Sequence, residues 1–343
     1  MERDAFHSSL GEFFRQFEGV ANLRSSTHTA SALSDYRFWS SRGLSLSSRN
    51  LRETGLHLLA NEITFEDDPS RALLLLIGMG DYAGARGLHE KTARDRDFAS
   101  FEHLAISQLL RKKAAPAFRS GFLDEHLLSL VEGKKIYILG PGEGSDLGSQ
   151  CASSDSLVLR FEEARRLPQL QRNVDIGWED SNPSRKEPKF LGNQKVLLVN
   201  YPEHMGRFSG HLPHVVRQER FEGLGGYGVP LGAMRAALNL LPYGPSEIYM
   251  SGIDFFLSDS QYEPGYGGAH QRDTLFHHWT LMHGHDLISN LHLGKALWLS
   301  GAVTGDERFL RAINTPAAVA ARVYDQTYWN RLYAYISRGI AVS

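Results

Sequence analysis

Histidine is the side chain whose charge changes near neutral pH, and in this chain it is concentrated in one segment. Six of the fifteen histidines lie between residues 270 and 292. His283 and His285 flank a single glycine, and Asp286 follows directly. An imidazole in such a segment can take a proton from a reacting hydroxyl as a general base. We therefore regard His285 and His283 as candidate catalytic residues.

The same cluster permits a metal site as an alternative. His283, His285 and Asp286 could present ligands from a loop and leave one coordination position open, as in zinc hydrolases. The HxHxDH pattern of metallo-hydrolases, however, needs the acid one place later and a histidine after it, whereas Leu287 follows Asp286 here. We expect no metal and keep the zinc hydrolase as an alternative. The residues that would complete its ligand set are His270, His277 and His278.

A second candidate site is the glycine-rich segment 140–145 (Gly-Pro-Gly-Glu-Gly-Ser), which follows an apolar run. At the carboxyl end of a parallel strand, glycines let a phosphate or ribose approach the backbone. No Gly-Lys-Ser/Thr closes the segment, which excludes a P-loop. A dinucleotide-binding loop with Glu162 on the ribose stays open, although Ser145 stands where its third glycine belongs. The nucleotide contacts expected here are Gly140, Gly142, Gly144, Ser145 and Glu162.

The segment 246–256 (SEIYMSGIDFF) combines an apolar run with small and acidic residues at its end. Ser251 and Gly252 would present a small hydroxyl and bare backbone at the end of a buried strand, which suits contact with a nucleotide. Asp254 follows, either as a further ligand contact or as an anchor for neighbouring backbone N–H groups. Phe255 and Phe256 are expected to pack in the core rather than to stack on a base.

This segment resembles the EIY-x-SGID-F motif of the bacterial CMP-sialic-acid-dependent sialyltransferases that modify lipooligosaccharide. Gly228 and the apolar helix pattern 230–241 resemble the glycine turn and helix that lead into the same strand in that family. The opening segment KKIYILGPGEGSDL resembles the family's first strand and glycine loop. The similarity covers roughly residues 134–300.

The resemblance implies an inverting, metal-independent transfer from a CMP-activated donor sugar. It implies a histidine base in a Gly-His context before an Asp-containing helix, which His285 matches best, with His283 second and His278 third. It also implies that Tyr262 contacts the phosphate that leaves with CMP. Gly228, Ser251, Gly252 and Asp254 complete the nucleotide contacts that we expect.

Three positions depart from the family pattern. Pro141 replaces an asparagine of the first glycine loop, and Glu162 stands near a second asparagine. Gly226 and Tyr227 occupy the place of the small hydroxyl residues that hold the sugar carboxylate. The expected donor is therefore sialic acid, Kdo or a related acidic sugar, and the acceptor is a glycan or glycolipid.

Composition limits the remaining function classes. With 37 Lys and Arg against 39 Asp and Glu, the net charge of −2 is too balanced to predict nucleic-acid binding. The single cysteine allows no internal disulfide. The longest apolar run, residues 72–79, is too short to span a membrane, and the first residues lack a secretory-signal pattern. We expect a cytoplasmic protein, with a peripheral position at the inner membrane as an alternative.

The helices and strands that must position these residues follow a different sequence pattern before and after residue 132. Residues 1–132 have helical spacing and indicate an all-α domain, with a protein partner as one possible role. Residues 133–343 show short apolar runs between helical patterns, typical of a Rossmann-like, doubly wound, mostly parallel α/β sheet. Segments 177–193 and 201–227 read as long polar loops, and 306–343 returns to helix. The predicted strands are 136–139, 157–159, 196–199 and 248–250.

The sequence therefore predicts a helical N-terminal domain and a Rossmann-like glycosyltransferase domain that resembles the GT-A-like sialyltransferase type. The CMP-sugar is a substrate, and no cofactor is expected. Two alternatives remain open besides the zinc hydrolase: an NAD-dependent oxidoreductase, and a scaffold whose helical half binds a partner while the sheet is inert.

Overall fold

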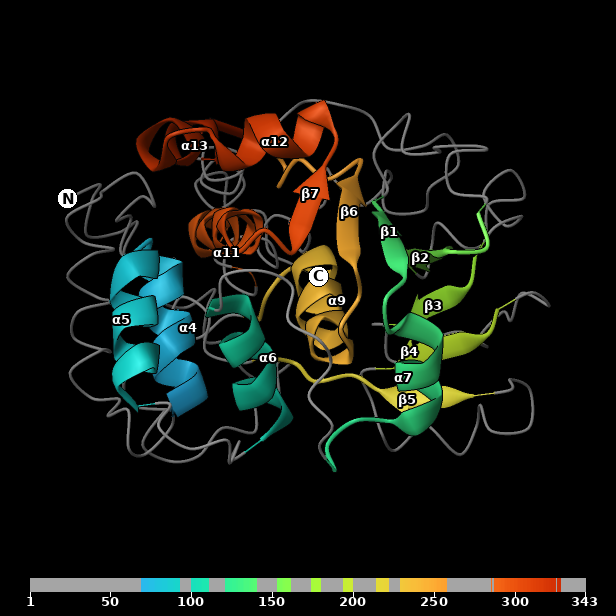
Figure 1. Ribbon diagram of the computed structural model, residues 1–343. Coiled ribbons are helices and arrows are strands. Elements are labelled where there is room, and N and C mark those ends of the chain that lie inside the picture. Colours follow the sequence, from blue (N-terminus) through green and yellow to red (C-terminus); the bar gives the residue numbers. More distant parts are fainter. Residues whose placement is uncertain are drawn as a thin grey trace, which may run out of the picture.

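The computed structural model is built around one parallel sheet with helices beside it (Figure 1). Its strands are β1 (Lys135–Leu139), β2 (Ser156–Phe161), β3 (Ile176–Glu179), β4 (Val196–Val199), β5 (Val215–Arg217), β6 (Glu247–Ser251) and β7 (Val303–Gly305). The structure describes residues 69–92, 100–110, 121–140, 153–161, 174–179, 194–199, 214–221, 229–257, 285, 287–324 and 326–327.

All four strands predicted from apolar runs are present, as β1, β2, β4 and β6. In β4 every residue is buried, which explains its continuous apolar run, since a central parallel strand is covered on both faces. The prediction was wrong where it placed loops over β5 and over most of β3. The β3 sequence Ile-Gly-Trp-Glu has no apolar run, and β5 is only three residues long, so neither gave a pattern to detect.

The order of strands in the sheet is β5-β4-β3-β2-β1-β6-β7, and every pairing is parallel. Strands β1 to β5 succeed one another towards one edge, after which the chain returns to the centre and adds β6 and β7 on the other side of β1. The α/β class with a Rossmann-like sheet is thus confirmed.

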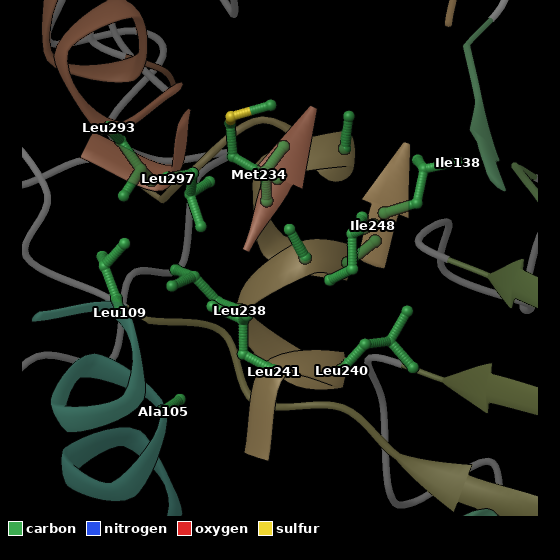
Figure 2. Packing of buried hydrophobic residues seen from close by; sticks show 14 of the residues in the cluster. Ala105, Leu109, Ile138, Met234, Leu238, Leu240, Leu241, Ile248, Leu293 and Leu297 are labelled. Atoms are coloured by element: carbon green, nitrogen blue, oxygen red, sulfur yellow. The ribbon is translucent and has the colours of Figure 1, made fainter. Parts of the chain in front are cut away.

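The face of the sheet that carries Ile138 and Ile248 packs against α9 (Gly232–Leu240) and α11 (Leu287–Leu299), and α6 (Phe101–Leu110) packs on these two helices. Figure 2 shows Met234 and Leu238 of α9 between these strand residues and the leucines of α6 and α11. Every residue of α9 from Ala233 to Leu240 is buried, including the polar Arg235 and Asn239, so the helix lies inside the core rather than at its surface.

The helices that precede the sheet belong to the same hydrophobic core. They are α4 (Pro69–Met79), α5 (Tyr82–Thr92), α6 and α7 (Glu125–Val131). Helix α4 packs along α11, where the Ser289 hydroxyl donates a hydrogen bond of 3.2 Å to the carbonyl oxygen of Gly78. The division into domains at residue 132 remains a prediction, but the described helices on its N-terminal side share one core with the sheet.

Two short helices, α12 (Glu307–Ile313) and α13 (Ala317–Tyr324), follow β7, in agreement with the helical pattern after residue 306. Helix α12 lies beside the carboxyl ends of β6 and β7, and α13 packs on α11, both at the top of Figure 1. Among the described residues, no helix is long and apolar enough to cross a membrane.

Leu238 tests the packing of α9 against the sheet. It is fully buried, so Leu238→Ala leaves a cavity between α9 and its neighbours and should lower the free energy of unfolding by about 2–5 kcal/mol. Leu299→Ala is the matched control, because that leucine is 50% exposed at the end of α11 and its loss should change stability by less than about 0.5 kcal/mol. Urea denaturation of both variants measures the difference, and equal values would contradict the described core.

Candidate functional site

The candidate site lies where the strand order reverses, at the carboxyl ends of β1 and β6. Gly140 directly follows β1 and Gly252 directly follows β6. The Gly140 N–H donates a hydrogen bond of 2.7 Å to the carbonyl oxygen of Ser251. A Cβ atom on Gly140 would lie 2.6 Å from the Gly252 carbonyl oxygen and 2.8 Å from Cγ1 of Ile253. Glycine is therefore needed at position 140 because the two strand ends approach each other closely.

The carboxylate of Asp306 holds this edge together. Its Oδ2 accepts hydrogen bonds from the Ser251 hydroxyl at 2.9 Å and from the Gly252 N–H at 2.8 Å. Its Oδ1 accepts from the Phe309 N–H at 2.8 Å, which makes Asp306 the N-cap of α12. The Asp306 N–H in turn donates to the Met250 carbonyl oxygen at 2.9 Å. One side chain thus joins the end of β6 to the start of α12.

This arrangement limits what Ser251 can do for a ligand. A serine hydroxyl has one hydrogen to donate and two lone pairs that accept. In Ser251 the hydrogen is directed to Asp306, so the oxygen can accept from a ligand while that bond persists. The sequence reasoning missed Asp306. Its signal was an aspartate after an apolar run and a glycine, followed by Glu307, a pattern typical of a helix N-terminus.

The turn after β6 has an uncommon backbone. Gly252, Phe255 and Phe256 all have positive φ, at 66°, 54° and 62°. The Phe256 N–H donates to Oδ1 of Asp254 at 2.9 Å, and the Leu257 N–H donates to the Asp254 carbonyl oxygen at 3.0 Å. Asp254 thus anchors neighbouring N–H groups, one of the two roles left open by its place after the strand.

Phe255 is buried, with 2% of its surface exposed, as the sequence reasoning predicted. Phe256 is only partly buried, and it also packs against the core. These two phenylalanines thus contribute to packing at the turn.

His285 is held at the entrance to α9. Its Nδ1 lies 3.0 Å from the Val229 carbonyl oxygen, and since a carbonyl only accepts, Nδ1 carries the hydrogen of this bond. In the neutral ring the lone pair is then on Nε2, the nitrogen that a general base uses. Nearby, the Leu231 N–H donates to Oδ1 of Asn290 at 2.7 Å, which ties the start of α9 to α11.

The start of α9 in turn lies at the carboxyl edge of the sheet. A Cβ atom on Gly232 would lie 3.2 Å from the ring of Phe161, the last residue of β2. The contact between His285 and Val229 therefore brings this histidine to the edge where β1, β2 and β6 end.

The structure thus describes five of the predicted site residues, and all five belong to this edge. They are Gly140, Ser251, Gly252, Asp254 and His285. The other predicted residues lie outside the described residues and stay predictions. They are Gly142, Gly144, Ser145, Glu162, Gly228, Tyr262 and His283.

Arg160 is a further charged residue at this edge that the sequence reasoning missed. It is 2% exposed, and the strand register pairs it with Leu139, which pairs on its other side with Ser251. Arg160, Leu139 and Ser251 therefore lie in one row across the ends of β2, β1 and β6. An arginine inside the otherwise apolar strand Ser-Leu-Val-Leu-Arg-Phe was the available signal.

The negative charge of Asp306 also reaches Tyr249, two residues before Ser251. Burial raises the pKa of the Tyr249 hydroxyl, and Asp306 raises it further, against a smaller opposite effect of Lys135. The tyrosine therefore keeps its proton at neutral pH. Within the described ranges, no three His, Cys, Asp or Glu side chains gather closely enough to hold a metal ion.

Comparison of the chain with protein-family models, with curated proteins and with solved structures found no match.

Gly140 gives a direct test of the close approach between β1 and β6. Gly140→Ala places a methyl group against the Gly252 backbone, which cannot move aside as a side chain would, so unfolding free energy should fall by roughly 1–3 kcal/mol. Gly87→Ala is the control, because a Cβ there meets nothing within 4 Å and alanine favours the helix. Chemical denaturation should separate the two variants, and a Gly140→Ala protein as stable as wild type would refute the described convergence.

Proposed function

We propose that this protein is an inverting, metal-independent glycosyltransferase that transfers sialic acid, Kdo or a related acidic sugar from a CMP-activated donor to a glycan or glycolipid hydroxyl. The observation that supports it most is the meeting of Gly140, Ser251, Gly252 and Asp254 where the strand order reverses. In open α/β sheets, nucleotides bind outside the carboxyl ends of the strands at such a point. The resemblance of segment 246–256 to the sialyltransferases supplies the choice of CMP.

The roles of the nucleotide contacts follow from their hydrogen bonds. Ser251 Oγ, whose hydrogen is directed to Asp306, accepts from a ribose hydroxyl or from the cytosine amino group. The phosphate is held by donors, for which we propose the backbone of residues 142–145 and the Tyr262 hydroxyl. The buried guanidinium of Arg160 favours an anionic ligand at this edge, because charge-assisted hydrogen bonds to phosphate or carboxylate are strong.

In the proposed reaction the acceptor oxygen attacks the anomeric carbon of the donor from the side opposite the phosphate. A bond forms between the acceptor oxygen and the anomeric carbon as the bond from that carbon to the phosphate oxygen breaks. The electron pair of the broken bond leaves with CMP. The proton of the acceptor hydroxyl goes to Nε2 of His285, or of His283 if that residue is the base. For His285, the Val229 carbonyl oxygen keeps the ring oriented and stabilises the imidazolium that forms.

We place this reaction in the cytoplasm, at the inner face of the membrane if the acceptor is a glycolipid. The described helices α4, α5 and α6 share one hydrophobic core with the described part of residues 133–343. A protein partner recruited through residues 1–132 would therefore lie next to the helices that cover the sheet.

Nucleotide-induced stabilisation tests the donor class. A ligand that binds only the folded state at about 100 times its Kd stabilises it by roughly 2.7 kcal/mol. A thermal-shift series with CMP, UDP, GDP and NAD should therefore show a raised Tm with CMP. A response to NAD alone would favour the oxidoreductase, a response to UDP alone another transferase, and no response to any nucleotide the inert scaffold.

Replacement of the base should slow the chemistry without weakening nucleotide binding. His285→Ala is expected to lower kcat for sugar transfer by about 10²–10⁴-fold, the usual contribution of a general base, while CMP affinity stays unchanged. The matched control is His126→Ala, which should have no effect. His126 is exposed, and its ring lies tilted against that of His214 at the amino end of β5.

The kcat of each variant is measured as the rate of CMP release from the donor in the presence of acceptor. A loss in His283→Ala but not in His285→Ala would assign the base to His283. Wild-type rates in both single variants and in the double variant would refute a histidine base. Activity that survives EDTA would rule out the zinc hydrolase, and its loss in EDTA would refute a metal-independent transfer.

A further inference from the structure

The turn after β6 contains two consecutive phenylalanines with left-handed backbone. Phe255 has φ of 54° and Phe256 has φ of 62°. For residues other than glycine, such conformations cost on the order of 1–3 kcal/mol each and persist only where the surroundings enforce them. The contacts around this turn should therefore reveal what enforces it.

The ring of Phe255 is fixed between two helices. On one side is Gly294 of α11, where a Cβ atom would lie only 2.6 Å from Cζ of Phe255. On the other side is Phe309 of α12, whose ring centroid lies 6.0 Å away. These contacts hold the Phe255 side chain, but they leave open the orientation of the peptide that follows it.

The peptide unit between Phe255 and Phe256 is held at both of its polar ends. Its carbonyl oxygen accepts a hydrogen bond of 2.8 Å from the hydroxyl of Tyr324, which is fully buried at the end of α13. Its N–H donates to Oδ1 of Asp254 at 2.9 Å. Turning this peptide over would reverse the sign of φ at Phe256 and relieve its strain, but it would break both bonds.

We propose that Tyr324 is a positioning residue, which locks this peptide and thereby fixes the Asp254 carboxylate at the ligand edge. Without the tyrosine hydroxyl, the peptide gains a second orientation in which the Asp254 carboxylate loses the hydrogen bond from the Phe256 N–H. For its effect on CMP the inference rests on the proposed function. The lock itself is a property of the turn and can be measured without a ligand.

Tyr324→Phe is the direct test, since it removes one hydroxyl and keeps the ring in the core. Amide hydrogen exchange at Phe256 and Leu257, measured without nucleotide, should accelerate by about fivefold to tenfold beyond the change at core amides, the factor that corresponds to one hydrogen bond. CMP affinity, measured by calorimetry, should fall by a similar factor of about five to ten.

Tyr243→Phe is the matched control. Tyr243 is another buried tyrosine, and its hydroxyl accepts the Asp124 N–H at 3.4 Å, next to the amino ends of the strands. This variant should lose stability without a change in exchange at Phe256 or in CMP affinity. If Tyr324→Phe does not fold, Asp254→Ala removes the opposite end of the lock and should accelerate exchange at Phe256 by the same factor.

The outcomes separate this inference from the proposed function. Unchanged exchange at Phe256 in Tyr324→Phe, or in Asp254→Ala if the first variant does not fold, overturns the lock, whatever the protein binds. Faster exchange with unchanged CMP affinity shows that Tyr324 is structural and overturns its positioning role. A wild-type protein that does not bind CMP refutes the proposed donor, and the lock is then decided by the exchange rates alone.

Discussion

The candidate site depends on the hydrogen bonds that the Asp306 carboxylate accepts. It accepts the Ser251 hydroxyl and the Gly252 N–H with one oxygen and caps α12 with the other. Gly140 then packs against the Gly252 carbonyl oxygen, so the end of β1 lies against the segment that the Asp306 carboxylate holds. Hydrogen bonds to a charged acceptor are stronger than neutral ones, so this carboxylate stabilises the contact between the end of β6 and the start of α12.

The helices outside the sheet help to fix the position of His285. Helix α11 begins beside this histidine and packs between α4 and the rest of the core. Ser289 bonds to α4, and Asn290 bonds to the start of α9, so both neighbours of α11 determine where its first turn lies. The N-terminal helices therefore contribute to the position of the proposed base, although they carry none of the proposed chemistry.

The hydrogen bonds of Asp306 and Asp254 determine which groups at the carboxyl ends of β1 and β6 are used within the protein. The Gly252 N–H and the Ser251 hydrogen are used within the protein, and Asp254 holds the turn that follows. Donors for a phosphate must then come from other groups at this edge, such as Arg160. Because its hydrogen goes to Asp306, the Ser251 hydroxyl can only accept from a ligand while that bond persists.

The sequence by itself determined the α/β class, four of the strands and the glycine and serine positions at their ends. It did so because continuous apolar runs and turn residues are local signals. Tertiary structure decided what those positions do. Asp306 lies 55 residues after Ser251 and Tyr324 lies 69 residues after Phe255, and no local pattern records that the fold brings them into hydrogen-bonding distance. Strand order and the burial of Arg160 likewise depend on long-range pairing, which a single sequence does not encode locally.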